Sequence, residues 1–395
     1  MRRRSSRRMP AMPRTVTLVL VDPTGTPLGE LPPITVPAPW WQEVDDLVAG
    51  IRAVHGIDVV ILRLLSADRP APPGGAVRYL AEYDGPPPAA LRPATPEAGP
   101  HPLRMPWARP GGPAASLDWA RTILGELTGV QRRTWNLSSI WRLDTAAGRV
   151  WLKEVPPFAA HEAAVLDWLA VPWLLAADGG RMLLEHVPGG DRYDAALPEV
   201  RDMLADLLTV QTTALGRAGE LVELGVPDAW APEFVPAAHA VMDRWIPMLD
   251  MAERVVVARL GDRLPERLAA VAACGLPDTL VHGDFHPGNV RGTGTRRVIL
   301  DWADCVVGHP ALDLLTVLDQ RKPDDQRVLA GQWCAFWRRA VPGCDPERAL
   351  GLMRPVAALH RAVKYANFLA AIEPSEHPFH AADPPAWLRL AAATR

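Results

Sequence analysis

The chain has 395 residues, of which 48% are hydrophobic and 22% charged, as in globular proteins long enough to form two or three domains. Its formal net charge of -3 gives no overall positive field, so no nucleic-acid partner is expected. No segment approaches the ~20 apolar residues of a membrane-spanning helix, so no membrane partner is expected either. Four cysteines without a CxxC spacing indicate neither a zinc site nor a disulfide framework and favour a cytoplasmic location.

The first 14 residues, MRRRSSRRMPAMPR, are strongly basic. The apolar stretch after them, TVTLVLV, runs directly into Asp22 and Pro23 and is too short for the core of a secretory signal. Residues 1–14 are therefore predicted to form a disordered tail. The alternatives are an anchor to an anionic surface, or a start codon placed too early, with Met9 or Met12 as the true start.

Residues 15–85 are predicted to form a small α/β module. Runs rich in β-branched and aromatic residues at 15–22, 58–66 and 76–84 favour strands, and helical spacing spans 40–56. These elements are enough for a separate small domain.

The next segment, residues 86–113, contains too much proline for regular structure and is predicted to be a linker. Beyond it, the pattern predicts a β-rich region over 114–190 and a mostly helical region over 191–395. The elements expected in the β-rich region are a helix at 115–127, strands at 131–135, 138–145 and 149–155, a helix at 161–170, and a strand pair ending within 181–190.

The helical region is interrupted at 279–302, where two strand-like segments, TLVH and RVILDW, end in polar residues. Asp284 and Asn289 lie on a loop with proline and glycine, and Asp301 follows the second segment. Such oxygen ligands suit Mg²⁺, which proteins usually hold through one or two carboxylates together with substrate phosphates. The remaining aspartate could orient and deprotonate an attacking hydroxyl, as phosphoryl transfer requires.

Lys153 lies in the middle of the predicted strand RVWLKEV, where apolar neighbours normally exclude a charge. Glu162 lies on the next predicted helix and can pair with it. Only three of the 42 lysines and arginines are lysines, and a phosphate clamp favours the compact charge of lysine over arginine. The alternative is an edge-strand lysine whose stem covers apolar surface while its charge reaches water.

The strings HGDFHPGN and LDWADCVVGHPALDLL resemble the catalytic core of the aminoglycoside phosphotransferase family, a branch of the protein-kinase-like fold that includes choline and homoserine kinases. The HGDxxxxN loop, an aspartate after an apolar strand, and GxPxxDL occur in order, and the resemblance covers about residues 115–390. It implies an α+β, bilobal protein-kinase-like fold, with a small β-rich N-lobe at 114–190 and a helical C-lobe at 191–395, after the small α/β domain.

The resemblance also implies roles for individual residues. Asp284 would be the catalytic base, and Asn289 and Asp301 would bind Mg²⁺. Lys153 and Glu162 would form the clamp that holds the phosphates of ATP.

Further residues are implied as support and as nucleotide contacts. His282 would hold the backbone of the catalytic loop, and Asp313 would cap the following helix and brace the loop. Backbone groups of Glu185, His186 and Val187 would contact the adenine.

The sequence departs from protein kinases in lacking the glycine loop GxGxxG, and NLSSIW occupies its place. Ser138 and Ser139 are therefore candidate phosphate contacts. Asp304 could approach the metal or the substrate, with a surface turn as the alternative. His286 is expected to support the loop rather than to take part in catalysis.

Residues 15–85 resemble a Nudix fold in their order of strand, helix, His55-Gly56 and strand. The Nudix motif REUxEExG supplies carboxylates to a metal, but here the charged positions hold Ala49, Gly50, Ala53 and Val54. Only Ile51 and Gly56 agree with the motif. We therefore expect a module for recognition or packing, without hydrolysis.

The main hypothesis is transfer of the γ-phosphoryl group from ATP to a hydroxyl of a small metabolite or antibiotic, assisted by Mg²⁺. The alternative is a kinase-fold regulator that binds nucleotide without small-molecule turnover. Phosphorylation of a protein fits less well, because no segment with DFG and APE landmarks follows Asp301.

Overall fold

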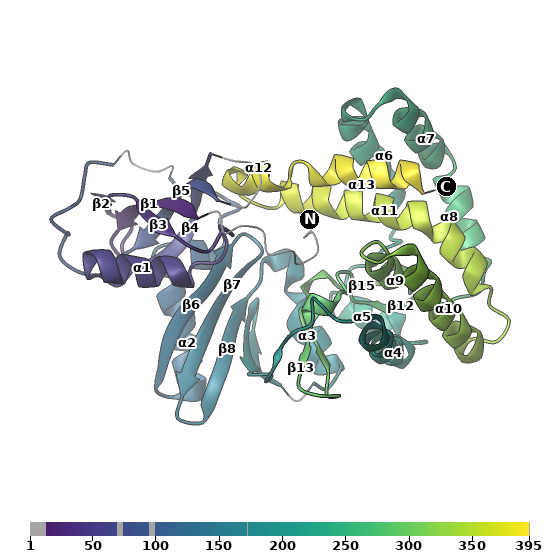
Figure 1. Cartoon of the computed structure of the whole chain (residues 1–395), viewed down its shortest axis with the longest axis horizontal. Coiled ribbons are helices and arrows are strands. Elements are labelled where there is room, and N and C mark those ends of the chain that lie inside the picture. The colour runs from purple at the N-terminus through teal and green to yellow at the C-terminus, as the bar shows by residue number, and fades with distance from the viewer. Residues whose placement is uncertain (1–12, 69–73, 95–98, 172, 395) are drawn as a thin grey trace.

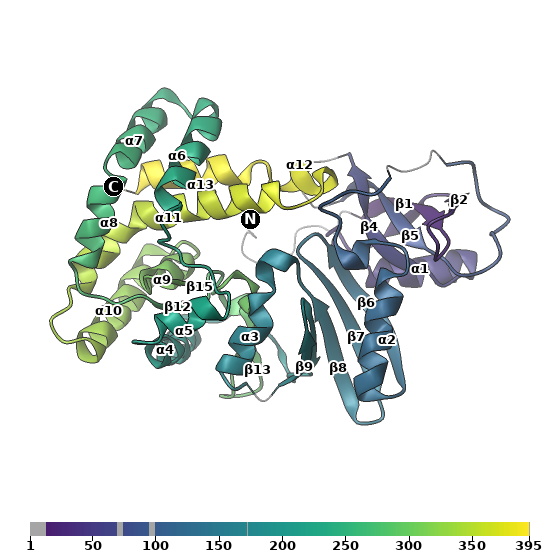
Figure 2. The ribbon, with the colours of Figure 1, turned by 180° about the vertical axis from the view of Figure 1, so that it is seen from behind.

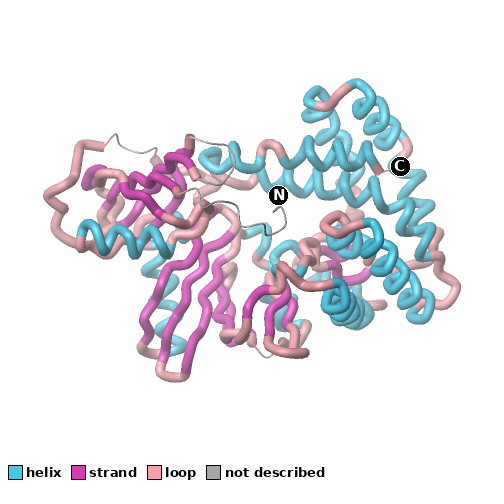
Figure 3. The backbone as a smooth tube through the Cα atoms, in the orientation of Figure 1, coloured by secondary structure: helices cyan, strands magenta, loops and turns pink. Residues whose placement is uncertain are grey.

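The structure is a computed structural model that describes residues 13–68, 74–94, 99–171 and 173–394. Three parts follow one another across the molecule: an N-terminal module, a five-stranded sheet, and a region of helices (Figure 1). Figure 3 shows the strands concentrated in the first two parts and the helices in the third. This is the predicted α+β arrangement. The predicted tail lies outside the described residues up to residue 12, and its last residue, Arg14, begins the first strand.

The N-terminal module is a mixed sheet with one helix. Its strands run in the order β2-β1-β5-β4, with β3 also paired to β1, and only the β1–β5 pair is parallel. The strands are β1 (Arg14–Val21), β2 (Pro27–Glu30), β3 (Ile34–Val36), β4 (Val60–Ala67) and β5 (Gly75–Glu82), and the helix is α1 (Asp45–His55). The three long strands and the helix are confirmed, whereas β2 and β3 are too short to leave a periodic signal.

Helix α1 ends where the Nudix-like pattern retains its glycine. Gly56 adopts the left-handed conformation, with φ of 68°, and its N–H donates to Arg52 O at 3.0 Å. Glycine is favoured at this position because it lacks a Cβ. A helix-ending role therefore accounts for Gly56 without any metal chemistry.

The next part is an antiparallel sheet with strand order β6-β7-β8-β10-β9. Its elements are α2 (Gly112–Leu124), β6 (Leu127–Trp135), β7 (Ser138–Thr145), β8 (Gly148–Glu154), α3 (His161–Trp168), β9 (Leu174–Asp178) and β10 (Arg181–Glu185). Leu143 and Leu152 face helix α2 in a shared apolar cluster, and Figure 2 shows α2 lying along the sheet. Because side chains alternate along a strand, Lys153 points to the opposite face, toward α3.

The third part consists of helices around small sheets. The helices are α4 (Leu197–Thr213), α5 (Ala218–Glu223), α6 (Phe234–Trp245), α7 (Met251–Asp262), α8 (Leu264–Ala272), α9 (Ala311–Leu318), α10 (Pro323–Ala340), α11 (Pro346–Ala370), α12 (His377–His380) and α13 (Asp383–Ala393). The strands are β11 (Gly190–Asp191), β12 (Thr279–Val281), β13 (Val290–Gly292), β14 (Val298–Ile299) and β15 (Val306–Gly308). Trp333 and Trp337 of α10 are fully buried in the main core. Among the described residues, no helix is long and apolar enough to span a membrane.

The N-terminal module is attached to the edge strand β6. The side chain of Gln131 donates to Ile61 O at 2.7 Å and accepts from Ile61 N at 2.9 Å, so it bonds both backbone groups of a residue in β4. Val44 N also donates to Arg132 O at 3.1 Å. The module is thus joined to the sheet through backbone groups as well as apolar contacts.

The proline-rich segment 86–113 is packed against its surroundings where it is described. It includes a short 3-10 helix, η1 (Pro106–Ala108), and Trp107 is buried and donates from Nε1 to Trp135 O at 3.0 Å. Arg104 forms a bidentate ion pair with Glu373 at 3.1 and 3.0 Å. These contacts connect the segment to both the sheet and the C-terminal helices.

Candidate active site

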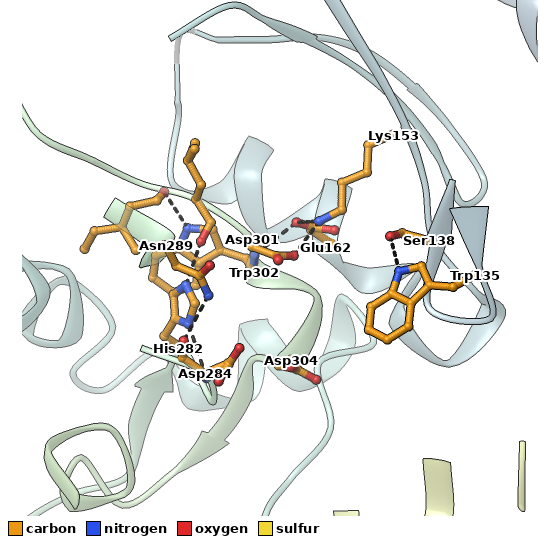
Figure 4. Close-up of polar contacts among 12 residues, drawn as sticks. Trp135, Ser138, Lys153, Glu162, His282, Asp284, Asn289, Asp301, Trp302 and Asp304 are labelled. Atoms are coloured by element: carbon orange, nitrogen blue, oxygen red, sulfur yellow. Dashed lines mark hydrogen bonds and ion pairs between the residues drawn. The ribbon is translucent and has the colours of Figure 1, made fainter. Parts of the chain in front are cut away.

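The loop predicted to be catalytic, residues 282–289, begins where the buried strand β12 ends. Gly283 has a φ of 79°, and a Cβ at this position would lie 2.0 Å from Asp304 O. Any larger residue would push the loop away from the 3-10 helix η5 (Trp302–Asp304). The glycine of HGD therefore lets Asp284 lie beside the segment that carries Asp301 and Asp304 (Figure 4).

Two buried residues hold this loop in place. The carboxylate of Asp313 accepts from His282 N at 2.8 Å and from Gly283 N at 2.9 Å, and Gln211 also donates to it at 3.0 Å. The His282 ring accepts from Asp284 N at 3.3 Å through Nδ1, so Nε2 carries the proton donated to Leu300 O at 2.9 Å. His282 and Asp313 therefore brace the loop in this structure.

One part of the Asp313 prediction is wrong. The residue lies inside the first turn of α9, whose N-cap is Pro310 without a side-chain capping bond. Its carboxylate points back to the catalytic loop and not to the first N–H groups of its own helix. It supports the loop and does not cap the helix.

Asp284 lies next to Asp304 (Figure 4), and its side chain is 48% exposed. Burial alone would raise its pKa, but the nearby His286 ring and the charge of Lys364 outweigh that effect and lower the pKa. His286 Nε2 lies 3.7 Å from Asp284 Oδ2, and Nδ1 accepts from Gly288 N at 2.9 Å. An ionised Asp284 can accept a proton from a hydroxyl.

Lys153 joins the two lobes through a pair of carboxylates. Its Nζ donates to Glu162 Oε1 at 2.7 Å and to Asp301 Oδ1 at 2.6 Å (Figure 4). Burial alone would lower the pKa of Lys153, but the two negative charges raise it, and the charge of Lys153 holds the pKa of Asp301 at about 2. Glu162 Oε1 also accepts from Trp302 N at 3.0 Å. Lys153 and Glu162 are thus paired, and Asp301 joins them.

Asn289 and Asp301 supply oxygen atoms next to this pair. Asp301 adopts the left-handed conformation, with φ of 65° and ψ of 65°, which is uncommon for a residue with a Cβ and is a feature of functional sites. Asn289 donates from Nδ2 to Asp284 O at 3.0 Å, so its Oδ1 is available as an acceptor. The described residues contain no cluster of three or more His, Cys, Asp or Glu fit to hold a metal by themselves. One amide oxygen and one carboxylate instead match a Mg²⁺ ion that is completed by phosphates and water.

The segment predicted to contact adenine forms the connection between the lobes. Glu185 N donates to Trp173 O at 2.7 Å, and His186 N donates to Arg149 O at 3.3 Å. Val187 O accepts from Arg291 Nε at 2.9 Å. The backbone of this connection is therefore fixed on both sides, and its contact with adenine stays a prediction.

The two serines of NLSSIW lie on opposite faces of the sheet. Ser138 Oγ accepts from Trp135 Nε1 at 2.9 Å, on the same face as Lys153 (Figure 4). Ser139 is fully buried and pairs with Glu154, on the face that α2 covers. We therefore keep Ser138 as a candidate phosphate contact and exclude the Ser139 side chain, because strand alternation turns it away from the cleft.

Lys364 and Asp304 form an ion pair near Asp284 that the sequence did not predict. Lys364 Nζ lies 2.8 Å from Asp304 Oδ1 and 3.4 Å from Gly283 O. The signal that could have identified Lys364 is the rarity of lysine, which was used for Lys153 alone.

A comparison with protein families identifies the family of the chain. The sequence model of the phosphotransferase enzyme family matches residues 129–350, more than half of the chain, and the chain belongs to this family. The N-terminal module lies outside the matched residues. No curated protein matches the chain in sequence.

Solved structures show the fold. A choline kinase from Streptococcus pneumoniae superposes with a TM-score of 0.50 at 13% identity, covering 71% of this chain and 99% of that one. A macrolide 2'-phosphotransferase from Brachybacterium faecium has a TM-score of 0.48 at 19% identity, covering 70% of this chain and 97% of that one. The family match and the choline kinase superposition confirm the α+β, bilobal protein-kinase-like fold, with the sheet β6 to β10 as the N-lobe and the helical part as the C-lobe.

Proposed function

We propose that the protein is a small-molecule kinase that transfers the γ-phosphoryl group of ATP to a hydroxyl group, with Mg²⁺ as cofactor. The observation that carries the proposal is the network in which Lys153 Nζ bonds both Glu162 and Asp301, next to the loop that holds Asp284 and Asn289. A lysine held by a helix glutamate, two oxygen ligands and an aspartate base are the parts that phosphoryl transfer requires.

Each residue has a distinct role in this proposal. Asp284 orients the acceptor hydroxyl and takes its proton as the hydroxyl oxygen bonds to the γ-phosphorus. The bond from that phosphorus to the bridging oxygen breaks, and ADP leaves with the electron pair. Lys153 neutralises the nucleotide phosphates, while Glu162 holds Lys153 in place. Mg²⁺, bound by Asn289 and Asp301, would offset the charge of the β- and γ-phosphates.

A small acceptor is favoured over a protein. Asp301 is followed in direct succession by η5, β15 and α9, which leaves no room for a long segment of the kind that positions a peptide. Family membership supports the same conclusion. Whether the acceptor is a metabolite or an antibiotic remains the question for experiment.

The experiment that tests the proposal is a screen of hydroxyl-bearing metabolites and antibiotics for stimulated release of ADP from MgATP. We expect at least one class of compounds to raise ADP release by the wild type and not by Asp284→Asn. Equal stimulation in both proteins would contradict the role of Asp284. Nucleotide binding without stimulation by any acceptor would favour the alternative, a kinase-fold regulator.

Three expectations from the sequence stay predictions: a cytoplasmic location, a Nudix-like fold of the N-terminal module, and a recognition or packing role for that module. The four cysteines are all free, which is compatible with a reducing compartment. The contacts of the module with β6 support the packing role.

A further inference from the structure

The inference concerns Lys364, on helix α11 beyond the residues that match the family. Its Nζ lies 2.8 Å from Asp304 Oδ1 and 3.4 Å from the carbonyl oxygen of Gly283, the residue that precedes Asp284. The ammonium group therefore lies against the catalytic loop from the C-lobe side. Lys153 lies on the opposite, N-lobe side, against Asp301.

The two lysines differ in how firmly they are held. The side chain of Lys153 is 9% exposed and bonds two carboxylates. That of Lys364 is 29% exposed, and its ion-pair partner Asp304 is 44% exposed. Water screens an ion pair that is exposed to this degree, so little opposes a turn of the Lys364 ammonium group toward another anion.

The reaction brings such an anion to this place. The group that is transferred must lie between ADP and the hydroxyl that Asp284 orients, roughly in line with both. Lys364 Nζ lies beside Gly283, the residue before Asp284, and we therefore expect the transfer point to lie within reach of its side chain. Positive charge on this side would offset the charge that spreads over the γ-phosphoryl oxygens in the transition state.

The amino-acid composition of the chain supports a functional role for Lys364. The chain has only three lysines among its 42 lysines and arginines, and two of them, Lys153 and Lys364, lie at the site. At a crowded phosphate, the compact and flexible ammonium group has an advantage over the broad guanidinium group. A merely structural cation between α11 and the loop could as well be arginine.

We propose that Lys364 is a second cationic catalytic residue, which contacts the γ-phosphoryl group from the acceptor side, and that Asp304 positions it when no nucleotide is bound. The proposal rests on the proposed kinase function. The contact proposed for Lys364 involves only the γ-phosphate, whereas Lys153 would also contact the inner phosphates of the nucleotide.

The test compares two nucleotides that differ in this phosphate. Binding of Mg²⁺-ADP and of Mg²⁺-AMP-PNP is measured by calorimetry for wild type, Lys364→Met, Lys153→Met and the exposed control Lys322→Met. We expect Lys364→Met to weaken AMP-PNP binding about tenfold, the effect of one lost charged contact, and to leave ADP binding within about twofold. Lys153→Met should weaken both, and Lys322→Met neither.

Equal effects of Lys364→Met on the two nucleotides, or no effect, would overturn the proposal. Failure of the wild type to bind either nucleotide would instead reject the kinase function itself. Lys364→Gln and Lys364→Arg are measured in parallel, with folding checked by circular dichroism, so that the result does not depend on one variant. Arginine should retain part of the preference for AMP-PNP, whereas a purely structural role predicts no difference between nucleotides.

Discussion

The candidate active site and the contact of the N-lobe with the C-terminal segment both contain a buried glutamate, but the two glutamates have different partners. In the cleft, Glu162 accepts from Lys153 and from a backbone N–H. In the second region, both oxygens of Glu376 accept from Asn136 N at 3.1 Å, and no cation of the described residues forms an ion pair with it. Burial raises the pKa of Glu376 to about 8.

The second region, which we call the junction, is formed by Trp41, Trp135, Asn136, Glu376 and Phe379. The rings of Trp41 and Phe379 lie 4.7 Å apart and those of Trp41 and Trp135 5.9 Å apart. The junction holds the N-terminal module, the β6–β7 turn and the 3-10 helix η6 (Pro374–Glu376) together. The comparison teaches that a buried glutamate paired with a lysine marks the candidate site of chemistry, whereas Glu376, equally buried but bonded to a backbone N–H instead, serves packing.

The largest expected effect is on turnover in the cleft. Asp284→Asn removes the base, and we expect kcat to fall about 10²–10⁴-fold with little change in nucleotide affinity, because Asp284 does not belong to the Lys153 clamp. Single-turnover kinetics and calorimetry measure the two quantities. Asp243→Asn, an exposed substitution on α6, is the matched control. A parallel loss of binding and turnover would contradict separate roles for the base and the clamp.

Loss of the clamp should affect both stability and binding. Lys153→Met leaves Glu162 buried without its cation, and breaking a buried ion pair in this way costs about 3–5 kcal/mol of unfolding free energy. Chemical denaturation measures this cost, with Lys322→Met as the control. If Lys153→Met weakens nucleotide binding without lowering stability, then the pair with Glu162 contributes nothing to the fold.

A smaller effect is expected at the junction. Glu376→Ala leaves Asn136 N buried without an acceptor, which costs about 1–3 kcal/mol. Denaturation of Glu376→Ala and of the exposed control Glu347→Ala measures the difference. If Glu376→Ala lowers the free energy of nucleotide binding by more than the free energy of unfolding, then the junction also acts on the NLSSIW segment, to which Asn136 belongs.

The last expected effect is a pH dependence of the junction. The pKa of Glu376 is raised from 4.5 to about 8 by burial, so between these values the folded chain binds one proton more than the unfolded chain. Relative to Glu376→Gln, the wild type should therefore lose stability as pH rises from about 4.5 to about 8, with a slope of at most about 1.4 kcal/mol per pH unit. If the free energy of unfolding depends on pH in the same way for the two proteins, then Glu376 is ionised in the folded chain.

The sequence alone predicted the elements with long periodic patterns, including β1, α1 and the strands of the N-lobe. It also predicted that His282 supports the backbone of the HGDFHPGN loop, because local motifs preserve spacing, while the catalytic and metal-binding roles in this loop stay predictions. The contact of Asp313 with the loop was anticipated, but not the direction of its carboxylate, which depends on how α9 packs.

Other features depend on the pairing of distant segments. Ser138 and Ser139 are neighbours in sequence, and only the register with β8 decides which of them faces Lys153. Lys364 and Glu376 contact Gly283 and Asn136 across more than 80 residues, and no local pattern links them. Such contacts follow from tertiary packing rather than from propensity.

The measurement that tests the central claim most directly is transfer of the labelled γ-phosphoryl group of ATP to a small molecule in the presence and absence of Mg²⁺. With an acceptor identified by the screen, we predict that label enters the small-molecule fraction with wild-type protein and Mg²⁺, and that chelation of the metal or Asp284→Asn abolishes it. Label released only as inorganic phosphate, at the same rate in wild type and Asp284→Asn, would contradict the account.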